Sequence, residues 1–199
     1  MFDPNAPARE GAGIYGLPFS LEESKLVYLP VPWEATTSYG GGTSEGPRAI
    51  LEASAQVDLH DLDVTTPWSP GLHMLEESAE VRSWNEEAKA EAEKIIDVGG
   101  DIQGNADLER ALARVNALGE KLNAYVESET ARLLALGKIV GIVGGDHSVP
   151  FGGMKAAAAR LGKFGILHID AHSDTRNAYE GFQYSHASIM HNVLTHIPE

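Results

Sequence analysis

The chain has 199 residues, of which 43% are hydrophobic, so it is long and apolar enough to form a folded domain with a core. Its formal net charge of −14 argues against nucleic acid or an anionic membrane as a partner, and its lack of cysteine excludes disulfides and thiolate metal sites. The amino terminus is not built like a signal peptide, and no apolar run approaches the ~18 residues of a membrane span. We therefore expect a cytoplasmic protein.

The first part of the chain predicts an arm, a strand and a helix. Residues 1–24 hold several prolines and glycines and are expected to form a surface arm. Residues 25–31 are a short apolar run that predicts a strand. A helix is predicted from Gly46 to about Val57, because Pro47 suits a first helical turn. Residues 58–83 are expected to be irregular.

Two helices are predicted in the middle of the chain. Residues 84–97 are rich in alanine, glutamate and lysine, and residues 107–136 form a longer segment that ends before Gly137. In the longer helix, apolar side chains recur at three- and four-residue steps and predict one buried stripe. Its members are Leu108, Leu112, Val115, Leu118, Leu122 and Val126.

The last third of the chain has the pattern of a βαβ unit. Residues 138–143 and 163–169 are apolar runs that predict strands, and residues 150–161 between them predict a helix. Unbroken apolar runs suit a parallel sheet that is covered on both faces. Because ligand sites form at the carboxyl ends of such strands, residues 144–148 (GGDHS) and 170–174 (DAHSD) are expected at the same edge of the sheet.

These two segments contain four candidate metal ligands. Asp170, His172 and Asp174 occupy alternate positions, which share one face of an extended chain. His147 comes from the neighbouring strand end. Carboxylates and imidazoles packed together are costly unless a cation compensates them, and this sulfur-free set suits manganese or a similar divalent ion. An ordinary solvated turn is the alternative that the spacing leaves open.

At this point the sequence resembles a known family. Residues 144–148 and 170–174 look like the first two signature motifs of the ureohydrolases, which include arginase, agmatinase, formiminoglutamase and guanidine hydrolases. The resemblance covers most of residues 25–57 and 137–196. It implies an α/β fold of three αβα layers with a mainly parallel sheet, as in arginases and deacetylases. Residues 25–199 would form this domain, incomplete at its carboxyl-terminal side.

The resemblance also implies a metal site and a reaction. The family holds two manganese ions, or nickel in some guanidine hydrolases. By motif match, His147 and Asp174 would bind one ion, His172 would bind the other, and Asp170 would bridge both. A metal-bridging hydroxide would then attack the carbon of a guanidino or amidine group, and an agmatinase-like enzyme would release urea.

Other residues receive roles by the same resemblance. His186 matches the histidine that shuttles protons to the leaving amine, although an ordinary loop histidine is the alternative. Asp146 matches a residue that orients its neighbours. Asn177 and Glu180 lie in the expected substrate-facing loop. His168, within the predicted strand, is expected to be packed or supporting rather than a ligand.

The sequence departs from the family in one respect. A third motif, roughly Ser-x-Asp-x-Asp-x-x-Asp-Pro, would supply two more metal ligands and is absent from these 199 residues. We therefore expect the sequence to be the first half to two-thirds of an enzyme whose hydrolysis needs the missing part. The complete protein would take a small cationic guanidino substrate and form a homo-oligomer, a trimer or hexamer.

Two alternatives stay open. The chain can be a truncated, non-catalytic remnant of this family that binds metal or a partner. It can also be a deacetylase-like hydrolase, because that family shares the general fold and an Asp-x-His element. The full Asp-Ala-His-Ser-Asp form of residues 170–174 argues against the second alternative.

Overall fold

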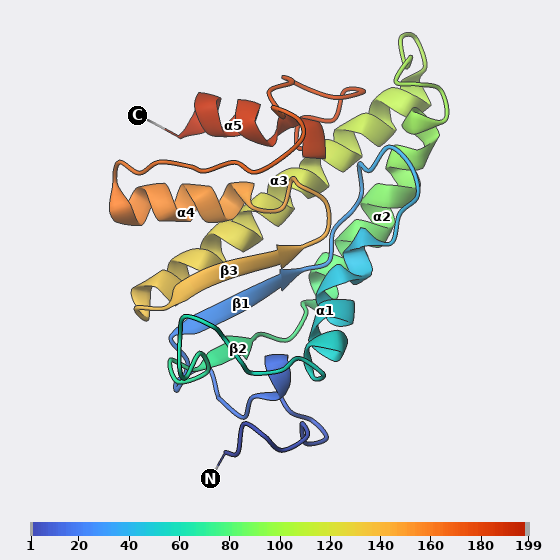
Figure 1. The fold of residues 1–199 in the computed structure, drawn as a ribbon. Helices are drawn as coiled ribbons and strands as arrows, with labels where there is room; N and C mark the ends of the chain where they lie inside the picture. Colours follow the sequence, from blue (N-terminus) through green and yellow to red (C-terminus); the bar gives the residue numbers. More distant parts are fainter. Residues whose placement is uncertain (1, 198–199) are drawn as a thin grey trace.

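A parallel sheet of three strands lies at the centre of the computed structural model, which describes residues 2–197 (Figure 1). The strands are β1 (Leu26–Val31), β2 (Leu72–Met74) and β3 (Ile139–Gly144), arranged in the order β2-β1-β3. Both pairings are parallel. The predicted parallel α/β architecture is therefore confirmed.

The register places the ends of two strands side by side. β1 pairs with β3 along its full length, and its last residue, Val31, lies opposite Gly144 at the end of β3. The segment that follows β3 therefore begins beside the segment that follows β1. β2 lies within the stretch expected to be irregular, because a strand of three residues is too short to show a recognisable pattern.

Five α-helices and three short 3₁₀ turns complete the described part of the chain. α2 begins earlier than predicted, because the Ser78 side chain accepts a hydrogen bond from Val81 N and caps the helix there. The helices are α1 (Gly46–Ser54), α2 (Ala79–Ile96), α3 (Ala106–Ala135), α4 (Phe151–Leu161) and α5 (Ile189–His196), and the turns are η1 (Ile14–Gly16), η2 (Thr43–Glu45) and η3 (His186–Ser188).

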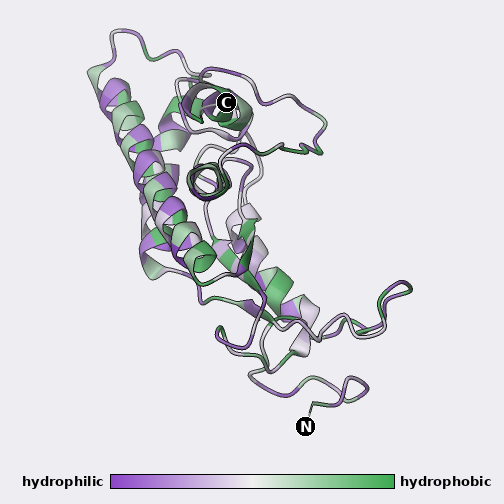
Figure 2. Ribbon diagram, turned by 90° about the vertical axis from the view of Figure 1, so that its left-hand side faces the viewer, coloured by the Kyte–Doolittle hydropathy of each residue, from purple (hydrophilic) through white to green (hydrophobic). Residues whose placement is uncertain are grey.

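The main core lies between the sheet and the two long helices. Leu29 and Val31 of β1 are fully buried and belong to one cluster with residues of α2 and α3. The predicted stripe of α3 is confirmed, because it faces this core and the adjoining cluster around Phe182. Figure 2 shows hydrophobic and hydrophilic residues alternating along the helices, as expected when one face is buried. No described helix combines the length and apolar character needed to cross a bilayer.

The opposite face of the sheet is covered by the amino-terminal segment and α1. Tyr28 points to the other side of β1 from Leu29, and its hydroxyl lies 3.1 Å from the Tyr15 hydroxyl of η1. The Tyr15 backbone N–H in turn donates to Ser54 Oγ at the end of α1. The sheet is therefore a middle layer between two sets of covering segments.

The predicted strand at residues 163–169 does not form. This segment, between α4 and α5 in Figure 1, has no regular secondary structure, and Leu167 and Ile169 are 85% and 87% exposed. The prediction was wrong because an apolar run defines a parallel strand only when a neighbouring strand and two covering layers bury it. Within residues 2–197, β3 pairs with β1 alone.

Candidate metal centre

The segment after β3 is fixed to the segment after β1 by a close backbone approach. Gly145 has a φ of +26°, and a Cβ at this position would overlap the Trp33 carbonyl oxygen. The same oxygen accepts a hydrogen bond of 2.8 Å from Asp146 N. Only glycine allows this approach, and it determines where the next residues, including His147, leave the sheet.

Four side chains meet beyond this point. His147, His168, Asp170 and Asp174 each direct one ligand atom into a region where all four atoms lie within 4.8 Å of one another. Nδ1 of His147 is 2.7 Å from Asp174 Oδ2 and 3.1 Å from Asp170 Oδ2. Nε2 of His168 is 3.8 Å from the same two oxygens. We call these residues the four-residue group.

Asp174 is held by its backbone as well as its side chain. Its φ of 50° lies in the left-handed region, which aspartate tolerates better than most residues. Its carbonyl oxygen accepts hydrogen bonds from Met190 N and His191 N in the first turn of α5. The carboxylate is only 7% exposed. An unusual conformation that the surroundings fix in this way is typical of functional sites.

His172, the third predicted metal ligand from this segment, lies outside the four-residue group. Its side chain is 82% exposed, and its Nδ1 is 3.4 Å from Asp170 Oδ1. Its backbone N–H donates to the same oxygen at 2.8 Å, and this hydrogen bond lowers the pKa of Asp170. Its role as a ligand remains a prediction that this arrangement does not favour.

His168 is in the group although the sequence analysis did not assign it as a ligand. The alternation rule would place residues 168, 170, 172 and 174 on one face, but it holds only for an extended strand. Because residues 163–169 are not a strand and residues 170–172 form a bend, the rule does not apply here. The proximity of His168 to Asp170 in the sequence was the one signal that could have identified it.

The four-residue group fits a divalent cation. Nε2 of His168 is buried and has no hydrogen-bond partner among the described residues, which is costly unless another atom satisfies it. Two imidazoles and two carboxylates without sulfur suit manganese, nickel or zinc. Four donor atoms match the coordination of one ion, and residues 2–197 contain no second group of this kind.

Asp146 lies next to this group and is almost completely buried. Its Oδ1 accepts hydrogen bonds from Ser148 N and Ser148 Oγ, whereas Oδ2 has no partner within the described chain. Burial raises the pKa of Asp146. The hydrogen bonds from Ser148 and the charge of His186 act on this pKa in the opposite direction.

The loop before His186 is tightly fixed. Phe182 is fully buried, and asparagines from two helices hold its neighbour Gln183: Asn116 Oδ1 accepts from Gln183 N at 2.9 Å, and Asn192 Nδ2 donates to Gln183 O at 2.9 Å. The His186 ring packs edge-on against Tyr179, and its Nδ1 is buried without a hydrogen-bond partner in the described structure. No hydrogen bond within the described structure therefore fixes this nitrogen.

The two predicted substrate-binding residues lie in the same loop. Asn177 is exposed. Glu180 has a left-handed φ of 52° and packs against the turn between α2 and α3, where a Cβ on Gly100 would lie 3.1 Å from the Glu180 Cα. No hydrogen bond or ion pair in the described structure joins either residue to the four-residue group, so their roles remain predictions.

Comparison with known proteins identifies the family. A sequence profile of the Arginase family matches residues 24–198, and the chain therefore belongs to this family. It is 31% identical over 175 residues to an N(1)-aminopropylagmatine ureohydrolase of Thermus thermophilus, covering 87% of this chain and 48% of the relative. It is 30% identical over 177 residues to the agmatinase of Bacillus anthracis, covering 87% and 49%.

Solved structures support the same fold. The agmatine ureohydrolase of Thermoplasma volcanium has a TM-score of 0.60 at 22% identity, covering 91% of this chain and 49% of that protein. The proclavaminate amidino hydrolase of Streptomyces clavuligerus has a TM-score of 0.66 at 19% identity, covering 97% and 54%. The predicted resemblance is thus confirmed, and the chain spans about half the length of the relatives it matches.

Proposed function

We propose that this chain supplies metal-binding residues of a ureohydrolase that cleaves a guanidino or amidine C–N bond and releases urea. The observation that carries this proposal is the four-residue group at the carboxyl edge of a parallel sheet in an Arginase family member. The names of two relatives specify agmatine-type substrates. A small cationic guanidino compound is therefore the substrate class that we propose.

We assign the metal to the residues that meet in space. His147, His168, Asp170 and Asp174 would hold one Mn²⁺, with Ni²⁺ as the alternative. Such an ion, when bound, supplies Lewis-acid activation of water and of the group under attack. The family resemblance implies two ions, and a second ion needs more donors than these four.

The remaining roles belong to groups around this site. His186 would transfer a proton to the leaving amine, because an imidazole both accepts and donates protons and its Nδ1 is unpaired within the described chain. Asp146 would support the strand end through Ser148. Asn177 and Glu180 would contact the part of the substrate that does not react. A cytoplasmic location and a trimeric or hexameric assembly belong to the same proposal.

Mn²⁺ binding and urea release test the proposal together. The purified chain is titrated with Mn²⁺ and then incubated with agmatine, arginine, 4-guanidinobutyrate and guanidine. We expect saturable Mn²⁺ binding that Asp170→Asn abolishes, and any urea release from these compounds should be lost in the same variant. A chain that binds no Mn²⁺ would contradict the assignment of the metal site.

A second candidate function is metal binding without turnover. The observation that favours it is the presence of one four-donor group within residues 2–197, in a chain that spans about half the length of its relatives. Saturable Mn²⁺ binding without urea release from any compound would support this candidate. Catalytic urea release by the chain would exclude it.

A further inference from the structure

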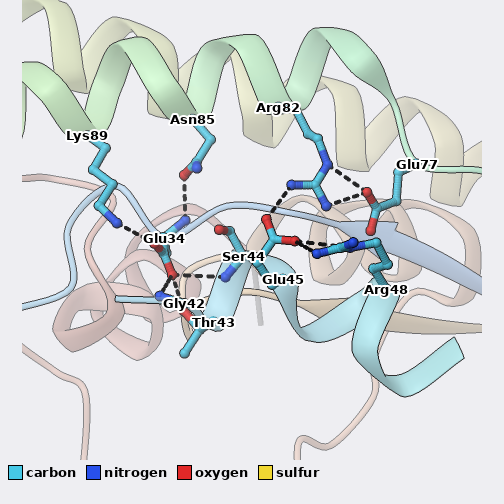
Figure 3. A network of polar contacts seen from close by, with 10 residues as sticks. All are labelled: Glu34, Gly42, Thr43, Ser44, Glu45, Arg48, Glu77, Arg82, Asn85 and Lys89. Carbon is cyan, nitrogen blue, oxygen red and sulfur yellow. Dashed lines mark hydrogen bonds and ion pairs between the residues drawn. The ribbon is translucent and has the colours of Figure 1, made fainter. Parts of the chain in front are cut away.

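A buried carboxylate outside the four-residue group organises the other side of the same edge of the sheet. Glu34 lies three residues beyond the end of β1, and its side chain is only 3% exposed. Figure 3 shows it between α2 and residues 42–44. A buried charge persists only when it is fully paired, so the groups around Glu34 indicate what its burial achieves.

Each oxygen of Glu34 contacts a different element. Oε2 accepts hydrogen bonds from Gly42 N at 2.6 Å, Ser44 N at 2.9 Å and Thr43 Oγ1 at 3.1 Å. Oε1 pairs with Nζ of Lys89 on α2 at 2.5 Å. Burial alone raises the pKa of Glu34, but the hydrogen bonds from Lys89 and Ser44 outweigh it and lower the pKa to about 2. The carboxylate therefore stays charged and connects the loop to α2.

The loop over residues 40–44, which we call the glycine loop, requires such an anchor. Gly40, Gly41 and Gly42 all have positive φ values, of 83°, 79° and 104°. Glycine adopts this conformation without strain but loses more conformational entropy than other residues when it is fixed. A side chain on Gly41 would also meet Lys89, because its Cβ would lie 2.8 Å from Nζ. The ordered loop therefore depends on contacts from outside it.

Glu34 and the glycine loop both adjoin the strand end that carries His147. The residue before Glu34 is Trp33, whose carbonyl accepts the hydrogen bond from Asp146 N. The residue that starts α1 after the loop is Gly46, and a Cβ there would lie 3.1 Å from the Gly144 carbonyl oxygen. The backbone N–H of Glu34 donates to Asn85 Oδ1 at 2.7 Å, which fixes this position to α2.

We propose that Glu34 is a positioning residue: by anchoring the glycine loop and the Trp33 segment to α2, it holds the end of β3 where His147 joins the four-residue group. The claim that Glu34 holds the end of β3 in place does not require a bound metal. Its consequence for metal affinity rests on the proposed function.

Glu34→Gln is the informative variant. The side chain keeps its size, but its NH₂ faces either the Lys89 ammonium or the N–H groups of the glycine loop, so a donor meets a donor in both orientations. Glu45→Gln is the matched control. Glu45 is a neighbouring glutamate whose side chain is 44% exposed; it pairs with Arg48 and Arg82, at 2.7 Å each, and accepts no hydrogen bond from the glycine loop.

Hydrogen exchange on the metal-free protein tests directly whether Glu34 holds the end of β3 in place. We expect the amides of Gly42, Ser44 and Asp146 to exchange about tenfold faster in Glu34→Gln than in wild type, and to be unchanged in Glu45→Gln. Amides in the middle of α3 report global opening and should stay protected. If Asp146 exchanges as in wild type while Gly42 accelerates, Glu34 fixes the loop alone and the proposal is overturned.

Mn²⁺ affinity provides a readout that a purely structural role would not change. We expect Glu34→Gln to bind Mn²⁺ about tenfold more weakly, the size of effect known for residues that orient metal ligands, and Glu45→Gln to bind as wild type does. Equal affinity of Glu34→Gln and wild type would overturn the proposal. If the wild-type chain binds no Mn²⁺, the proposed function is contradicted instead. Hydrogen exchange of the Asp146 amide then still tests whether Glu34 holds the end of β3.

Lys89→Met covers the case in which Glu34→Gln does not fold. This variant leaves the three hydrogen bonds from residues 42–44 in place and removes the ammonium that joins Glu34 to α2. We expect faster exchange at Gly42 and Asp146, again with unchanged α3 amides. Exchange identical to wild type at both amides would overturn the proposal independently.

Discussion

Nδ1 of His147 lies 2.7 Å from Asp174 Oδ2, although the two residues are 27 positions apart in the chain and the whole of α4 lies between them. Without a cation this contact is an imidazole–carboxylate pair. With one, we propose that both atoms would serve as ligands. The pair therefore joins the end of β3 to the loop before α5, and the proposed metal site depends on it.

His168 and His172 provide the sharpest comparison within the site. We expect His168→Gln to weaken Mn²⁺ binding by more than about tenfold and His172→Gln to change it less than about threefold, because only the first imidazole faces the other three donors. Titrations followed by the electron paramagnetic resonance of free Mn²⁺ measure both. The reverse order would restore His172 as the ligand, as the sequence pattern suggested, and displace His168.

Two variants of Asp174 test the effect of its charge and the effect of its backbone conformation separately. Asp174→Asn keeps a residue that tolerates the left-handed region, so we expect near-normal stability and loss of Mn²⁺ binding. Asp174→Ala should lose binding as well and should also be less stable by about 1 kcal/mol, because alanine is strained at this φ. Urea denaturation and Mn²⁺ titration distinguish the two effects. Equal stability of both variants would argue against the left-handed conformation.

Gly145 tests whether the close approach to Trp33 fixes the strand end. Gly145→Ala places a Cβ where it overlaps the Trp33 carbonyl oxygen, so we expect a loss of more than about 2 kcal/mol. Gly137→Ala is the control, because Gly137 also has a positive φ, of 73°, but lies in open space. It should cost only the backbone strain, about 1 kcal/mol. Similar losses in the two variants would show that the close approach is unimportant.

Glu34 makes the stability depend on pH. Its pKa falls from an ordinary 4.5 to about 2 in the folded protein, a difference worth about 3 kcal/mol. Because the folded pKa is the lower one, this stabilisation is complete above pH 4.5 and is lost as the pH falls toward 2.

Chemical denaturation of wild type and Glu34→Gln between about pH 7 and pH 2 measures this contribution. The gap in unfolding free energy should stay constant above about pH 5 and narrow below about pH 4.5, because a protonated Glu34 presents the same donor as the amide. A gap that does not change with pH would mean that the carboxylate is not preferentially charged in the folded state.

The sequence predicted those elements whose signals are local. The apolar stripe of α3 and the apolar runs of β1 and β3 each extend over the whole element, so the type of element can be recognised from its own residues. The Gly-Pro pair at the start of α1 marks the beginning of a helix. β2 was missed because three residues carry too little pattern. Residues 163–169 were misassigned because a buried strand depends on neighbours that the run itself does not specify.

The residues of the site were likewise predictable only where they lie in a local sequence motif. His147, Asp170 and Asp174 follow from the two sequence motifs at residues 144–148 and 170–174, and the structure brings them together. His168 rather than His172 lies in the group because of the bend at residues 170–172, which residue spacing does not reveal. Glu34 escaped notice because an isolated glutamate carries no pattern, and only its burial and its hydrogen bonds to the glycine loop distinguish it.

Whether the four-residue group binds a metal is decided by Mn²⁺ titration of the purified chain, followed by electron paramagnetic resonance with wild type and Asp170→Asn in parallel. We predict one saturable Mn²⁺ per wild-type chain and no saturable binding by the variant, since Asp170 is one of only four donors that meet within residues 2–197. Absence of binding by wild type, or equal binding by the two proteins, would contradict the proposed metal site.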